Sequence, residues 1–349
     1  MTLEQAAVIR RDNYLPLRHL AALMVIYGHC YALAPHPEAE MDVVARWMPG
    51  FYAGNLAIYV FFAMSGYLVT LSLLKHPGIW RYARNRLLRV YPGYLACLFV
   101  CTFVIGVLFT TLSSRDYLQA PQTWQYFSYN LKVVSLVWTL PGVFTGNHYP
   151  DVVNGALWSL GLEVRWYLYL GLLAALTVVR RRTVFTIAVL AWLGYGCWQW
   201  WTGQPDPLEH RALSQVFLLA ALCAQWRERI PVSHAIMIGL IALALLSHGS
   251  GWFGPSVAVT TVYATFWIAY RLPPLPWRND IDLSYGLFLY GFPVQQSLAH
   301  LFPSMTPLQM LPCAASVTLV LAILSWYLVE RPALALKQHS RLELHRVPA

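Results

Sequence analysis

Ten apolar runs, each long enough or nearly long enough to cross a bilayer, constrain the fold of this chain more than any other feature. Hydrophobic residues make up 58% of the sequence and charged residues 11%, whereas soluble domains have about half and about a quarter. A helix needs about 20 apolar residues to cross the hydrocarbon core. We therefore expect an all-α membrane protein with about ten transmembrane helices in one bundle. The runs cover residues 15–33, 51–74, 90–112, 156–179, 183–201, 212–226, 234–248, 255–270, 283–301 and 311–329.

The distribution of basic residues predicts the orientation of these runs. If the N-terminus is cytoplasmic, nineteen Lys and Arg residues fall in cytoplasmic segments and four in outer segments. Cytoplasmic loops of membrane proteins are enriched in Lys and Arg, so we expect both termini in the cytoplasm and an even number of spans. The net charge of +9 then reflects this loop asymmetry and does not indicate a nucleic-acid partner.

The longest loop, residues 113–155, is expected on the outer side. It contains the semi-apolar stretch VVSLVWTLPGVF, which is too short to span a bilayer. This stretch is expected to lie on the membrane surface or to form a re-entrant segment.

The first apolar run carries two ionisable side chains, Arg18 and His29. They lie eleven positions apart, so in a helix they share one face to within about 20° and are about 16 Å apart along the axis. Ionisable side chains inside a bilayer are costly and often mark functional sites, which makes both residues candidates. The alternative is that Arg18 reaches the cytoplasmic surface and His29 is a satisfied polar residue of the bundle.

Glu163 lies in the fourth run, within the segment LWSLGLEVRWYL. It is about seven residues from the outer end of its run and His29 about four from the outer end of its own, so both are expected at similar depth. A carboxylate and an imidazole at one depth relieve each other's burial cost and can act as a base with its orienting acid. The alternative is a polar pair that only joins two helices. Arg165 lies on nearly the opposite face and stays unassigned.

Arginines cluster after the second run, in the segment RYARNRLLRVYPGY, where Arg86 and Arg89 precede a Tyr-Pro pair. Guanidinium groups suit bidentate binding to phosphate. Arg18 is expected at the same membrane face, so the pattern favours a polyphosphate ligand that enters from the cytoplasm. The alternative is that these arginines mark topology or contact anionic lipid headgroups.

Two more runs contain small, polar or helix-breaking residues. In FFAMSGYLVT, the pair Ser65 and Gly66 predicts close helix packing, and the Ser65 hydroxyl is a candidate for lining the site. The ninth run reads SYGLFLYGFPVQQ; its Tyr285 is a second candidate lining residue, and Pro293 is expected to kink the helix.

The tenth run closes with YLVERP. We expect the helix to end at Pro332 and Glu330 to pair with a loop arginine. Residues 1–349 are expected to form a single integral membrane domain with spans over about 15–332 and a short cytoplasmic tail over 333–349.

In combination and in this order, six segments resemble the acyltransferase-3 family of bacterial integral membrane acyltransferases. They are the pair Arg18 and His29, FFAMSGYLVT, RNRLLRVYPGY, LWSLGLEVRWYL, SYGLFLYGFPV and YLVERP. The resemblance implies ten helices in the bacterial inner membrane and transfer of an acyl group, usually acetyl, from cytoplasmic acyl-coenzyme A (acyl-CoA), without a metal. The implied acceptor is a hydroxyl of a surface glycan, such as lipopolysaccharide O-antigen or exopolysaccharide, or of a lipid-linked sugar.

The resemblance also assigns roles to individual residues. The essential histidine of the family corresponds to His29, its partner arginine to Arg18 and its acid to Glu163, whereas the family's arginines after the second span correspond to Arg86 and Arg89. His29 and Glu163 are thus expected to be catalytic, and the three arginines to bind acyl-CoA. Direct transfer with His29 as base and an acyl-histidine intermediate both stay open.

One position departs from the family pattern. Many members have a histidine before the aromatic-proline pair of the ninth span, and this chain has Gly291 there, so no catalytic role is expected at that position. Acceptor choice is expected in the outer loops, where Trp138, His148 and Asp151 are candidates.

Two other functions stay open. A transporter would use the same polar residues as a pathway, and internal inverted repeats would support it, but none is apparent. The other is a non-catalytic membrane partner of a polysaccharide assembly complex. The sequence does not indicate the oligomeric state.

Overall fold

The computed structural model describes residues 1–8, 12–37, 40–76, 78–204, 210–277 and 280–344, with side chains up to residue 337. Several basic residues used for the orientation lie outside this description: Arg10, Arg11, Arg278, Arg346 and the side chain of Arg341. Within it the fold is all-helical, and β-structure is limited to isolated bridges.

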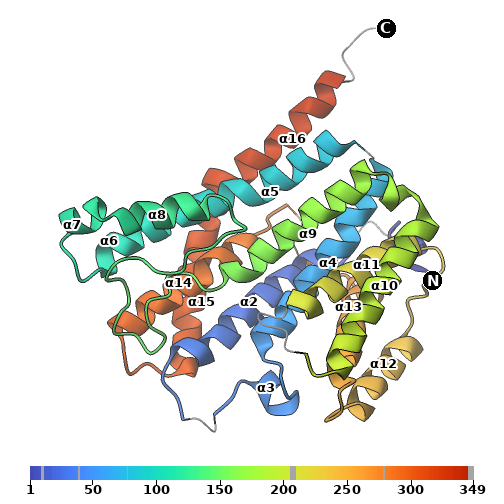
Figure 1. Ribbon diagram of the computed structural model, residues 1–349, viewed down its shortest axis with the longest axis horizontal. Helices are drawn as coiled ribbons and strands as arrows, with labels where there is room; N and C mark the ends of the chain where they lie inside the picture. Colours follow the sequence, from blue (N-terminus) through green and yellow to red (C-terminus); the bar gives the residue numbers. More distant parts are fainter. Residues whose placement is uncertain (9–11, 38–39, 77, 205–209, 278–279, 345–349) are drawn as a thin grey trace. The chain divides into compact units, whose positions relative to one another are not determined.

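A helix lies in each of the ten apolar runs, which confirms the all-α prediction (Figure 1). The ten are α2 (Tyr14–Leu33), α4 (Ala53–Lys75), α5 (Ile79–Phe99), α9 (Leu157–Ala175), α10 (Arg182–Trp201), α11 (His210–Gln225), α12 (His234–Leu246), α13 (Phe253–Arg271), α14 (Ser284–Leu301) and α15 (Pro307–Ser325). The short helix α1 (Leu3–Ala6) precedes the ten. The short helices between them are α3 (Val43–Trp47), α6 (Gly106–Phe109), α7 (Ser114–Gln119), α8 (Pro121–Asn130) and a 3-10 turn, η2 (Val178–Arg180).

Three continuous helical segments in the described residues are long and apolar enough to cross a membrane: Ala53–Lys75, Ile79–Phe109 and Pro307–Lys337. The helix His234–Leu246 is apolar but shorter. Length and composition therefore support a membrane protein, and the number of spans and their orientation stay predictions.

The arginine-rich segment after α4 is helical, whereas the sequence indicated a loop. Helix α5 begins at Ile79, eleven residues before the predicted start of that span. Arg, Leu and Ala are strong helix formers, and this explains the extension. The helix continues past Pro92 into a π turn, η1 (Val100–Ile105), and then into α6.

The predicted helix end at Pro332 is wrong. Helix α15 passes through a π turn, η4 (Trp326–Glu330), into α16 (Arg331–Leu344), so most of the predicted tail is helical. Pro332 is the second residue of α16 and comes directly after the π turn.

The loop of residues 113–155 (loop 113–155) contains α7 and α8, and irregular backbone runs from Leu131 to Ala156. The stretch 133–144 is not helical, and antiparallel bridges join Thr110 to Val143 and Thr139 to Val152. Val143 and Phe144 are fully buried, so this loop is anchored by its own apolar side chains.

The chain forms two compact units. The first comprises Met1–Ala21, Val43–Tyr82 and Arg165–Asn279. In it α4 packs against α11 and α13, α10 against α11, and α12 against α13. The approach of α4 to α11 depends on Gly66, because a Cβ there would lie 2.2 Å from the Phe217 carbonyl oxygen. This confirms the close packing predicted for Gly66.

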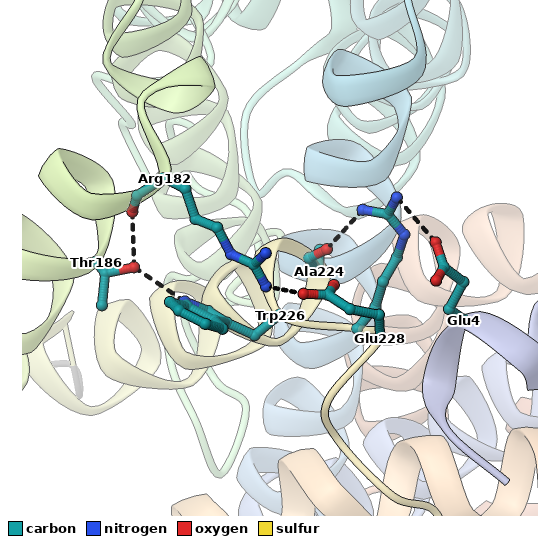
Figure 2. Close-up of polar contacts among 7 residues, drawn as sticks. Glu4, Arg182, Thr186, Ala224, Trp226 and Glu228 are labelled. Atoms are coloured by element: carbon teal, nitrogen blue, oxygen red, sulfur yellow. Dashed lines mark hydrogen bonds and ion pairs between the residues drawn. The ribbon is translucent and has the colours of Figure 1, made fainter.

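A polar cluster of the first unit joins the chain start to the segment after α11 (Figure 2). Glu4 pairs with Arg227 at 3.2 Å, and Arg182 pairs with Glu228 and lies 3.7 Å over the ring of Trp226. The hydrogen bond from Arg182 lowers the pKa of the Glu228 carboxyl. This cluster connects Arg182, the first residue of α10, to Glu228 in the segment after α11.

The second unit comprises Ala22–Asp42, Ala83–Val164 and Asp280–Ala349. Helices α14 and α15 lie side by side in it (Figure 1), and Gly286 allows this because a Cβ there would lie 2.7 Å from the Ala322 Cα. Helix α8 packs on η1 and α7. All candidate residues between Ala22 and Asp42, including His29, therefore belong to the α14–α15 unit.

Gly66→Ala is expected to destabilise the protein, because the added methyl group meets backbone that cannot move aside. Overpacking of this kind costs about 1–3 kcal/mol. Thermal unfolding of the detergent-solubilised protein, followed by circular dichroism, measures the effect. The matched control is Gly239→Ala in α12, where a Cβ meets nothing within 4 Å. Equal melting temperatures for the two variants would show that Gly66 does not set the distance between α4 and α11.

Candidate active site

His29 lies in the last turns of α2 and is 6% exposed. Its ring contacts the ring of Phe292 in α14 edge to face, with centroids 5.2 Å apart. Its Nδ1 atom is buried and has no hydrogen-bond partner among the described residues. A buried polar atom without a partner is costly, and such groups are typical of functional sites rather than of packing.

Helix α14 holds the same face of α2 through Gln295. The Gln295 Nε2 group donates to the Ile26 carbonyl at 2.8 Å and to the Cys30 Sγ at 3.1 Å. Ile26 and Cys30 lie four residues apart on one side of α2, and His29 directly precedes Cys30 in the chain. The Gln295 side chain is therefore fixed next to the histidine.

Gly291 explains how α14 comes so close to α2. A Cβ at this position would lie 3.0 Å from the Ile26 Cγ1 atom, which is already tight. The Ile26 side chain would therefore have to shift to admit a larger residue at position 291, next to the turn that carries His29.

Loop 113–155 contacts the same turn of α14. Asn154 donates through Nδ2 to the Leu289 carbonyl at 2.9 Å, and Gly155 lies so close to the Phe292 ring that a Cβ would be 2.7 Å from it. Tyr149, in the same loop, lies with its ring centroid 6.3 Å from that of Phe292. Phe292 therefore contacts His29 of α2 as well as Tyr149 and Gly155 of loop 113–155.

Sequence reasoning missed Asn154 and gave no role to Gln295. Asn154 stands three residues before the start of the LWSLGLE segment and nine before Glu163, and nothing in the sequence marks it as buried. Gln295 follows a proline in an apolar run, where a polar side chain is rare enough to note.

Gln296, the neighbour of Gln295, belongs to a separate and fully paired network. Its Nε2 donates to the carbonyls of Tyr149 and Val152, and its Oε1 accepts from Asn147 at 2.8 Å. His300 Nδ1 lies 3.2 Å from the Asn147 Oδ1. This network connects loop 113–155 to the last turns of α14.

Glu163 is half-buried in α9 and lies within electrostatic reach of Tyr285 at the start of α14. It does not bond to the Nδ1 of His29, because that atom has no partner among the described residues. The pairing of Glu163 with His29 as orienting acid stays a prediction.

Arg89 is not a free cation but forms an ion pair with Asp282 at 2.6 Å. Asp282 also accepts from the Ser284 hydroxyl at the start of α14. The guanidinium lies 5.7 Å from the ring centroid of Tyr285, and the Tyr285 hydroxyl donates to the Val90 carbonyl at 2.7 Å. Arg89 and Tyr285 are thus held together at one end of α14.

Glu330 lies near this pair. It is buried, accepts from the Ser325 hydroxyl at 2.8 Å and interacts electrostatically with Arg89. Its Oε2 atom has no hydrogen-bond partner among the described residues. The expected arginine neighbour of Glu330 is therefore Arg89, which lies on helix α5 rather than in a loop.

The other predicted site residues are Arg18, Arg86 and Ser65. Arg18 is half-buried on the part of α2 that belongs to the first unit, and Arg86 is half-buried on the part of α5 that belongs to the second. Ser65, in the first unit, lies 2.9 Å from the Tyr167 hydroxyl. The convergence of Arg18, Arg86 and Arg89 on one ligand stays a prediction.

Comparison with known proteins assigns the chain to a family. The family model described as an acyltransferase domain, Acyl_transf_3, matches residues 17–329. No solved structure matches the chain. The chain is similar to an O-acetyl transferase of Shigella phage Sf6, with 26% identity over 90% of this chain and 93% of the relative.

Two other relatives agree with this match. Nodulation protein 10 of Rhizobium leguminosarum bv. viciae is 24% identical over 94% of both chains. The acyltransferase MdmB of Streptomyces mycarofaciens is 26% identical over 46% of this chain and 38% of its own length. With a family match over nearly the whole chain, an all-helical fold and membrane-length helices, this protein belongs to the acyltransferase-3 family and is a membrane acyltransferase.

Proposed function

We propose that the protein is an O-acyltransferase that moves an acyl group, normally acetyl, from cytoplasmic acyl-CoA to a hydroxyl of an extracytoplasmic surface glycan or lipid-linked sugar. The ten helices span the bacterial inner membrane, and both termini are cytoplasmic. The observation that carries the proposal is His29, a buried histidine whose Nδ1 has no protein partner among the described residues, in a chain of an acyltransferase family. The phage relative, named as an O-acetyl transferase, supports oxygen as the acceptor atom.

The proposed chemistry needs one base. A sugar hydroxyl is a weak nucleophile at neutral pH, so His29 takes its proton as the oxygen attacks the thioester carbonyl. The new bond joins the sugar oxygen to the acyl carbon, and the carbon–sulfur bond breaks. His29 then returns the proton to the departing thiolate, so that free coenzyme A and an acyl ester result.

The positively charged side chains serve the donor in this proposal. Coenzyme A carries several phosphates, and arginine binds phosphate through two parallel hydrogen bonds. Arg18, Arg86 and Arg89 are the proposed ligands. Because Arg89 already pairs with Asp282, a phosphate would either share this guanidinium or replace the carboxylate.

His29→Ala is expected to abolish transfer while the protein still inserts, because no other base replaces the imidazole. Glu163→Gln is expected to lower the rate by on the order of a hundredfold. The two losses are not expected to add, since the residues act as one unit. Glycan acetylation at matched membrane levels of each variant measures this. Full activity of His29→Ala would refute the mechanism, whereas normal activity of Glu163→Gln would remove only the proposed partner.

Arg18→Ala is expected to raise the apparent dissociation constant of acetyl-CoA by about tenfold or more, because one charge-assisted hydrogen bond is worth about 1.5–3 kcal/mol. Arg18→Lys is the control, and it should restore binding only in part because an ammonium cannot bind bidentately. Equilibrium binding of acetyl-CoA to the purified protein measures both. Unchanged affinity in Arg18→Ala would leave Arg18 as a topology marker.

The proposed orientation is tested with two tags. A tag after Ala349 is expected in the cytoplasm, and a tag within the segment from Pro35 to Pro49 is expected on the opposite face of the membrane. The reason is that nineteen Lys and Arg residues lie in the segments predicted to share the membrane side of the N-terminus, and four lie in the others. Protease or thiol-reagent accessibility in intact cells reports the side of each tag. Both tags on one face would contradict the orientation and the even number of spans.

A further inference from the structure

Three buried polar atoms without a protein partner in the described residues belong to side chains that contact Phe292 or lie next to its contacts: His29 Nδ1, Gln295 Oε1 and Asn154 Oδ1. Gln295 is 0% exposed and Asn154 is 1% exposed. The contacts given above bring all three to one place, because His29 and Gly155 touch the Phe292 ring and Gln295 lies one turn after it on α14. Other buried polar atoms without a partner occur in this unit. These three are the ones that belong to His29 and to the residues next to its contact with α14.

The amide orientations of Gln295 and Asn154 are fixed by their donors. Gln295 Nε2 donates to the Ile26 carbonyl, and Asn154 Nδ2 donates to the Leu289 carbonyl. Either amide, if flipped, would set its oxygen against a carbonyl oxygen, so the network assigns the unpaired atom of each side chain as the oxygen. Both unpaired amide atoms are therefore hydrogen-bond acceptors.

An acceptor atom selects a ligand that donates a hydrogen bond. The thioester group itself has no O–H or N–H group, although the pantetheine arm of the donor carries amide N–H groups, whereas a sugar has several hydroxyls. Two fixed carbonyl oxygens thus match a polyhydroxylated acceptor, and unchanged acetyl-CoA binding in the variants below would exclude the donor amides as their partners. The Phe292 ring supplies an apolar wall between them, and Tyr149, which is 46% exposed, extends the aromatic contacts toward the solvent-facing loop.

We propose that Gln295 and Asn154 form a subsite that accepts hydrogen bonds from hydroxyls of the sugar next to the one that reacts at His29. The two residues thereby position the acceptor and set which hydroxyl receives the acyl group. This inference rests on the proposed function, because it needs a sugar acceptor and a reactive His29.

The neighbouring glutamine provides the control. Gln296 has the same side chain, lies on the same helix and is also 0% exposed, but its amide is fully paired with protein groups. Gln295→Met and Gln296→Met remove the same amide from adjacent positions and preserve the length of the side chain. A role in packing alone would affect both variants, and a role in acceptor binding only the first.

The experiment measures three quantities for each variant. Ester-linked acetate is released by alkali from the surface glycan of cells that carry only the variant, at matched membrane levels. The dissociation constant of acetyl-CoA and the melting temperature are measured on the purified protein. We expect Gln295→Met to lower glycan acetate by tenfold or more, with the acetyl-CoA constant within twofold of wild type. We expect Gln296→Met to lower the melting temperature but to retain the glycan acetate.

Asn154→Leu is the second variant, and it keeps the proposal testable if Gln295→Met does not fold. It is expected to show the same separation, with reduced glycan acetate and unchanged acetyl-CoA binding. Equal losses of acetate in the Gln295 and Gln296 variants, or wild-type acetate in both Gln295→Met and Asn154→Leu, would overturn the subsite.

These outcomes are distinct from failure of the proposed function. If His29→Ala retains full glycan acetate, the catalytic proposal fails, whatever the amides do. If His29→Ala is inactive and the two amide variants are fully active, only the subsite fails.

Discussion

A buried polar group needs a hydrogen-bond partner, and in a chain this apolar the requirement governs both the backbone and the site. The backbone of the described residues meets it mainly within helices, and the irregular stretch from Leu131 to Ala156 adds turns and isolated bridges. The side chains meet it through short, specific pairs, such as Arg89 with Asp282 and Gln296 with Asn147. The buried side-chain atoms that remain unpaired in the described residues therefore point to candidate ligand contacts. Three of them belong to His29, Gln295 and Asn154, on or near the contacts of Phe292.

The site depends on how closely helices can approach. Glycines at 66, 286 and 291 lie where another helix, α11, α15 and α2 respectively, would meet a Cβ. At the last of these positions the close approach brings α14 against the turn of α2 that carries His29.

The sequence was sufficient to predict the helices, because each apolar run is long and each is bounded by charged or helix-breaking residues. It was not sufficient at the ends of α5 and α15. There the local signals, an arginine-rich segment and a proline, are compatible with either a helix or its end, and packing decides between them. His29 could be singled out as a candidate because a histidine in an apolar run is rare. Gln295 and Asn154 could not, since two adjacent glutamines look alike in sequence and only the contacts show which one is fully paired.

The two π turns, η1 in the segment from α5 to α6 and η4 between α15 and α16, have a geometric consequence. A π turn contains one residue more than the α-helix it interrupts, and one residue corresponds to about 100° of rotation about the axis. The helices on either side of each π turn therefore differ in phase. The apolar helix α15 and the basic helix α16 can thus present different faces although no loop separates them.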